Sequence, residues 1–168
     1  MKNLKTLSFL LFLSVLILSC SKNDDDDGSA GGEAEFTAMI DGGTFNNYTS
    51  ELGSYSATST NGLTIAVTDS NLNIVRLFMN ATGGFSTGVV KEIGNVDGNG
   101  FATTVIIRDQ DAQITYNASS GSITITSLRN GDGDNFKLIN GNFNVTATTN
   151  TGETVTMTGN FKNIEYLD

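Results

Sequence analysis

Apolar and polar residues alternate along most of the chain after residue 33, and no segment there has a helical period. In residues 63–68 (LTIAVT), Leu63, Ile65 and Val67 fall on one face and the threonines on the other. A period of two is typical of half-buried β-strands. The same pattern predicts further strands at 36–40, 55–59, 74–80, 87–93, 102–108, 114–118, 122–127, 137–148 and 153–161.

Turn-forming residues separate these strands at short intervals. Asn61-Gly62 lies between two alternating runs and is a strong hairpin signal. Turns are also expected at 69–71, 119–121 and 150–152, and longer loops at 94–100 and 129–135. Asn140-Gly141 has two interpretations: a hairpin turn, or a strand in which Gly141 packs under a large neighbour.

About ten short strands joined by hairpins predict an all-β fold, an antiparallel meander that closes as a barrel-like or sandwich domain. A barrel is slightly favoured, because the chain has no proline and few lysines to protect exposed strand edges, and closure removes edges. The expected organisation is a signal peptide at 1–19, a linker at 20–32 and a single all-β domain at 33–168.

The N-terminus has the features of a secretory signal. Lys2 and Lys5 precede an apolar run at 7–18. This run of about 12 residues is shorter than the roughly 20 that span a bilayer as a helix. Basic start, short apolar run and small-residue site occur in the order of a signal peptide.

Residues 17–20 (ILSC) resemble the bacterial lipobox, with an aliphatic residue, a small residue and then Cys20. The resemblance implies that Cys20 receives a thioether-linked diacylglyceryl group, that the chain is cleaved before it, and that the new amino terminus is acylated, with palmitate as a typical chain. Two or more acyl chains hold a protein stably on a membrane. The alternative, an ordinary buried thiol, leaves the order of these features unexplained.

An acidic segment follows the cysteine. Residues 21–32 (SKNDDDDGSAGG) contain four adjacent carboxylates and small residues, which predicts a disordered tether. This segment resembles the surface-export signal of Bacteroidetes-type lipoproteins, which implies that the domain is displayed on the cell surface. A solvated spacer on a periplasm-facing lipoprotein is the alternative. The residues of the candidate export signal are Ser21, Lys22, Asp24, Asp25, Asp26 and Asp27.

Residues 35–45 (EFTAMIDGGTF) and 121–166 resemble a family of Bacteroidetes lipoproteins of unknown function. The shared features are an opening F-x-A-x-I-D-G strand and closing strands of the G-x-F and N-I-x-Y kind. The resemblance implies an all-β secreted domain anchored to the outer membrane. It supplies no catalytic residue.

Composition limits the chemistry. The chain of 168 residues carries 18 acidic and 9 basic residues, no histidine and one cysteine. An acidic chain without a basic cluster is not expected to bind nucleic acid. Without histidine there is no Ser-His-Asp machinery, and the commonest transition-metal ligand is missing. We therefore expect a non-enzymatic protein without a cofactor.

Acidic pairs are the remaining candidates for a site. Asp109 with Asp111 and Asp132 with Asp134 would serve a carboxylate-based glycoside hydrolase, but both pairs are in turn-like segments where aspartate caps its own backbone. Asp97 with Asn99, and Asp132 with Asp134, are weak calcium candidates in oxygen-rich loops. Solvated loops are the preferred interpretation of both.

The expected function is therefore binding. A surface module that engages a glycan, a protein or matrix would present exposed aromatic rings or an apolar patch. Its candidate sugar-stacking residues are Tyr48, Tyr55, Tyr116 and Tyr166, although half-buried strand positions are the commoner role for such tyrosines. The alternative is a barrel that carries a small apolar ligand in its interior, in the periplasm or at the outer membrane.

Overall fold

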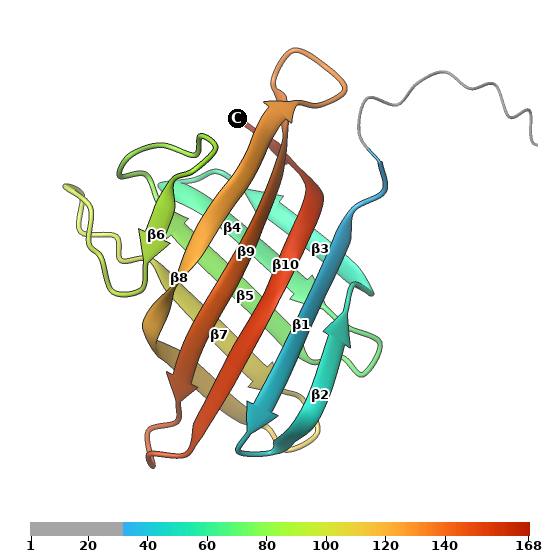
Figure 1. Ribbon diagram of the computed structural model, residues 1–168, viewed down its shortest axis with the longest axis vertical. Coiled ribbons are helices and arrows are strands. Elements are labelled where there is room, and N and C mark those ends of the chain that lie inside the picture. The colour runs from blue at the N-terminus through green and yellow to red at the C-terminus, as the bar shows by residue number, and fades with distance from the viewer. Residues whose placement is uncertain (1–31) are drawn as a thin grey trace, which may run out of the picture.

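The computed structural model describes residues 32–168, so Cys20 and the candidate export signal lie outside the described residues. The predicted all-β meander is confirmed (Figure 1). Within residues 32–168 no helix is long and apolar enough to cross a membrane. The strands are β1 (Glu35–Gly42), β2 (Phe45–Glu51), β3 (Ser54–Thr58), β4 (Gly62–Thr68), β5 (Ile74–Asn80), β6 (Val90–Glu92), β7 (Thr104–Asp109), β8 (Ile114–Asn130), β9 (Phe136–Thr148) and β10 (Thr154–Leu167).

All strands belong to one antiparallel sheet in the order β2-β1-β10-β9-β8-β7-β5-β4-β3, and β6 pairs with β8 beside this path. The sheet curls into a half-barrel (Figure 1). The two edge strands, β2 and β3, are consecutive in the chain and are joined through Leu52 and Gly53. Their backbones form no ladder with each other. The sheet therefore does not close into a complete barrel, because β2 and β3 do not pair, and both strands remain as edges.

Figure 1 shows two layers that cross obliquely, with β1, β2, β9 and β10 in front of β3, β4, β5 and β7. Strand β8 belongs to both layers, since its first residues pair with β7 and the rest with β9. The predicted turn at 119–121 is wrong, because this segment is the bend inside β8. The register shifts between Ala118 and Ser120, and Gly121 has φ +112°. A Cβ on Gly121 would lie 2.1 Å from the Asn144 carbonyl oxygen.

Two further positions show why sequence and structure differ. Strand β2 was not predicted, because its sequence (FNNYTSE) is polar and buries only Phe45 and Ser50. It forms by pairing with β1. Gly141 follows the second of its two interpretations. It lies inside β9, where a Cβ would be 2.4 Å from the Phe161 ring. Glycine at 141 therefore makes room for an aromatic ring of the core.

The core lies between the two layers and is built from the apolar side of each alternating strand. Phe36 and Phe143 stack in the front layer with ring centroids 5.5 Å apart. Leu63, Ile65 and Leu77 of the back layer are fully buried. Burial of a side chain of this size contributes about 1.5–3 kcal/mol. The alternation therefore assigns one face of each strand to the core and leaves the other face for solvent or a ligand.

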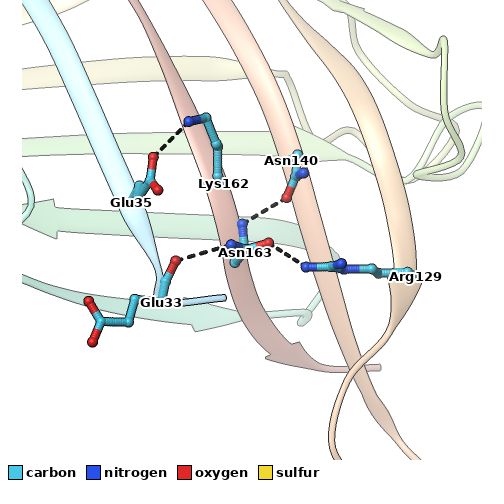
Figure 2. Close-up of polar contacts among 6 residues, drawn as sticks. All are labelled: Glu33, Glu35, Arg129, Asn140, Lys162 and Asn163. Atoms are coloured by element: carbon cyan, nitrogen blue, oxygen red, sulfur yellow. Dashed lines mark hydrogen bonds and ion pairs between the residues drawn. The ribbon is translucent and has the colours of Figure 1, made fainter. Parts of the chain in front are cut away.

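The described chain enters the sheet at a bulge in β10. The β9–β10 register shifts between Phe161 and Ile164, and Asn163 lies there with φ +51°. The Asn163 side chain donates a hydrogen bond to the Glu33 carbonyl oxygen (3.1 Å) and accepts one from the Arg129 guanidinium (2.5 Å). Its backbone amide donates to the side-chain oxygen of Asn140 (2.7 Å) (Figure 2). Asparagine tolerates this backbone conformation better than most residues. These bonds fix the point at which residues 32–34 join the domain.

Candidate functional site

An open groove of about 430 Å³ lies on the outer face of the back layer. Small-ligand sites have volumes of about 300–1,000 Å³. The groove lies over β4, β5 and β7, between the β3–β4 turn and the loop that precedes β7. Its lining residues are Thr58, Thr60, Asn61, Thr64, Arg76, Phe78, Phe101, Thr104 and Ile106.

Arg76 lies on the floor of the groove, at the centre of the back layer. Its strand neighbours Val75 and Leu77 point into the core, so alternation directs Arg76 outward. Across the sheet it pairs with Ala66 on β4 and Ile106 on β7. The exposed guanidinium has no hydrogen bond or ion pair with any of residues 32–168. A free cation on a partly apolar floor is available to an anionic ligand.

Two phenylalanines form the apolar wall of the groove. Phe78 projects from β5 on the same face as Arg76, and Phe101 comes from the loop before β7. Their ring centroids are 6.3 Å apart with an interplanar angle of 59°. Phe101 keeps 36% of its surface exposed, and Phe78 is half-buried. The pair therefore offers ring surface to a ligand in the groove that Arg76 also lines.

Two side chains hold the backbone of Phe101 in place. The Asp97 carboxylate accepts the Phe101 amide at 2.9 Å, and the Asn80 side-chain amide donates to the Phe101 carbonyl oxygen at 3.2 Å. Asn80 also donates to the Asn95 carbonyl oxygen at 2.7 Å and is 1% exposed. The loop is therefore anchored to the end of β5, which fixes the wall of the groove relative to its floor.

A buried cation supports the same corner of the fold. Lys91 is 2% exposed, and its ammonium donates to the carbonyl oxygens of Asn80 (2.8 Å) and Thr82 (2.5 Å). It also lies 4.7 Å from the centroid of the Phe85 ring. Burial lowers the pKa of Lys91 below its usual value of 10.5. Its contacts make Lys91 a brace between β6 and the loop after β5.

The two weak calcium candidates lie in different loops. One Asp97 oxygen caps the amides of Asn99 and Phe101, and the other is buried without a hydrogen-bond partner among residues 32–168. Asp132 and Asp134 lie in the β8–β9 loop, where Asp132 lines a smaller recess of about 180 Å³ with Glu165. No group of three or more metal-ligating side chains occurs among residues 32–168. In this structure Asp97 shapes the loop that carries Phe101.

The pair Asp109 and Asp111 is divided by burial. Asp109 is 9% exposed, and Asp111 is exposed. Burial opposes ionisation of Asp109, but hydrogen bonds from the Thr44 hydroxyl and from the amides of Ala112 and Asp111, with the nearby charge of Arg108, lower its pKa below 3.8. Asp109 is therefore an ionised structural acceptor at neutral pH.

None of the four tyrosines lines the groove. Tyr116 is buried, and its hydroxyl accepts the Thr44 amide at 3.0 Å. The Tyr48 hydroxyl donates to Asp69 at 2.6 Å, and burial, followed by that bond, raises its pKa above 10.0. Tyr166 is 3% exposed, while Tyr55 is 36% exposed and lines the smaller recess. The groove therefore takes its aromatic rings from phenylalanine.

Sequence reasoning missed Arg76, Phe78 and Phe101. A signal existed in β5, whose sequence IVRLFMN is apolar on both faces apart from Arg76 and the terminal Asn80. An isolated sheet face that meets only water normally carries polar residues, so apolar residues on both faces indicate a second contact surface. Comparisons with models of protein families, with curated protein sequences and with solved structures find no match to this chain.

Proposed function

We propose that this chain is a lipid-anchored envelope protein that acts as a non-enzymatic binding module and takes its ligand in the groove over Arg76, Phe78 and Phe101. The single observation that carries the proposal is the free Arg76 guanidinium beside two partly exposed rings. Binding sites combine apolar surface with a few polar groups that orient the ligand. The groove has both, on the outside of a packed domain.

The lining favours binding over hydrolysis. Paired carboxylates are the usual machinery of glycoside hydrolases. The groove holds an arginine, two phenylalanines and several threonines, but neither aspartate nor glutamate is among its lining residues within 32–168. The interior carrier has less support, because the inward side chains of both layers pack together as one apolar cluster. The groove on the outer face is therefore the better place for a ligand.

The anchor and the side of the membrane belong to the same proposal. The lipobox-like ILSC and the acidic run that follows support attachment of Cys20 to the outer membrane, with the domain facing outward. The test uses whole cells treated with a broad protease. Wild-type chain is expected to be lost while a variant with Asp24–Asp27 changed to Asn is protected, and Cys20→Ser is expected to abolish palmitate labelling. Equal protection of both chains until lysis would contradict surface display.

Binding in the groove is tested with the full-length chain purified in detergent micelles. The probes are a printed panel of neutral and acidic glycans, decanoate, and a short glutamate-containing peptide. At least one probe is expected to bind, with at least tenfold weaker binding to the double variant Arg76→Gln, Phe101→Ser.

The matched control for the groove variant is the double variant Lys162→Gln, Phe136→Ser. It removes an exposed cation and a ring of similar exposure (39%) from elsewhere on the domain. Retention by the control and loss in the groove variant supports the proposal. The absence of binding to every probe, or equal loss in both variants, overturns it.

A further inference from the structure

The charge in the groove is opposite to that of the chain. The protein carries 18 acidic and 9 basic residues, yet the charged residue among the groove's lining residues is Arg76. The net negative charge of the chain repels polyanions, whereas a single carboxylate held on an arginine gains a directed, paired contact. Arginine is also the side chain best suited to a planar carboxylate. The groove therefore fits a ligand with one isolated carboxylate.

The remaining polar groups around Arg76 are neutral. Four threonine hydroxyls and the Asn61 amide line the groove, and none has a side-chain hydrogen bond to residues 32–168. Hydroxyl and amide groups both donate and accept hydrogen bonds. Such groups match a ligand that carries several hydroxyls. An alkyl chain would leave them without partners wherever it excluded water.

The rings of Phe78 and Phe101 complete the match. Their tilted rings line the same groove as the cation, and the C–H face of a sugar ring is apolar enough to pack on such a surface. The floor of the groove is less suited to a peptide. Arg76 lies on an interior strand whose backbone is already paired with β4 and β7, so the floor has no free main-chain edge for strand addition.

We infer that the groove binds a saccharide that carries a single carboxylate, such as a uronic acid within an otherwise neutral oligosaccharide. Arg76 holds the carboxylate, the Phe78 and Phe101 rings pack against the sugar ring, and the threonines with Asn61 bind its hydroxyls. This inference rests on the proposed function and names the ligand class of the same groove.

The test is isothermal titration of the full-length chain in micelles with an aldobiouronic acid, a disaccharide of one uronic acid and one neutral sugar. The comparison ligand is the neutral disaccharide in which a hydroxymethyl group replaces the carboxylate. The acid is expected to bind at least tenfold more tightly, and Arg76→Gln is expected to remove that difference. Lys162→Gln is the control and should preserve it. Higher salt is expected to weaken binding of the acid more than of the neutral sugar.

Decanoate and the glutamate-containing peptide are titrated in parallel. Equal affinity for the acidic and neutral disaccharides overturns the carboxylate assignment. Binding of decanoate or peptide alone, sensitive to Arg76→Gln, overturns the saccharide assignment and leaves the binding function intact. The absence of Arg76-dependent binding by every probe overturns the inference and the proposed function together.

Discussion

The side-chain amide of Asn80 lies 3.2 Å from the carbonyl oxygen of Phe101 and donates a hydrogen bond to it. Asn80 ends β5, the strand that carries Arg76 and Phe78, whereas Phe101 belongs to a loop further along the chain. The Asn80 carbonyl oxygen also accepts a hydrogen bond from the Lys91 ammonium. One buried asparagine thus connects the floor of the groove, its wall and the brace beside it.

Replacement of Asn80 tests this connection. Asn80→Ala removes the donor to Asn95 and Phe101. It is expected to lower the free energy of unfolding by about 1–3 kcal/mol, because the carbonyl oxygens of two part-buried hydrogen bonds lose their donor. Ligand binding should also weaken, because the Phe101 backbone loses a hydrogen bond that holds its loop in place. Urea unfolding and titration of the same sample measure both. Asn142→Ala on the exposed face of β9 is the control, and equal effects of the two changes would contradict the assigned role.

The buried Lys91 predicts that the free energy of unfolding rises with pH in the alkaline range. Burial lowers its pKa in the folded protein below 10.5, so between the two pKa values the unfolded chain binds a proton that the folded chain does not. The free energy of unfolding therefore rises with pH in that window. Lys91→Met lacks this contribution. Urea unfolding at increasing pH up to 10.5 is expected to show the free energy of unfolding of wild type rising relative to that of the variant. Parallel pH profiles of the two proteins would refute the assignment.

The ionised Asp109 carboxylate predicts a loss of stability at acidic pH. Hydrogen bonds from Thr44 and two backbone amides outweigh burial and lower its pKa below 3.8. The stabilisation is present above that value and is lost as pH falls through the folded pKa. Asp109→Asn is expected to cost about 1–3 kcal/mol at pH 7 and to flatten acid unfolding. Asp111→Asn, at an exposed position, should retain the wild-type acid profile; if it flattens the profile equally, Asp109 is not the group responsible.

Gly121 is expected to tolerate no side chain. A Cβ there would meet the Asn144 carbonyl oxygen at 2.1 Å, and φ is +112°. Gly121→Ala should therefore lower the free energy of unfolding by at least about 1–3 kcal/mol, through overpacking and backbone strain. Gly98→Ala is the control, since nothing lies within 4 Å of its Cβ position. Chemical denaturation of both variants decides, and a Gly121→Ala protein as stable as wild type would exclude the tight bend.

Local patterns were sufficient for most of the strands, β2 excepted, and for most turns. Alternation identified the core face of β1 and β4, because a strand with one buried face must place apolar residues at every second position. The sequence also predicted the turn at Asn61-Gly62, because asparagine and glycine favour the positive φ that both residues adopt. The same rules failed at Gly121, because glycine serves a turn and a strand bend equally well.

The candidate site depended on contacts between distant segments. The sequence by itself determined the all-β class, the alternating core and the acidic charge, all of which follow from residue type and short-range spacing. Only the tertiary structure decided that β5 lies between β4 and β7, which places Arg76 on the floor of a groove and Phe78 in its wall. Strand neighbours are chosen by long-range hydrogen bonding and shared burial. For the same reason, Phe101 became the wall of the groove only when Asn80 and Asp97 fixed its loop over β5.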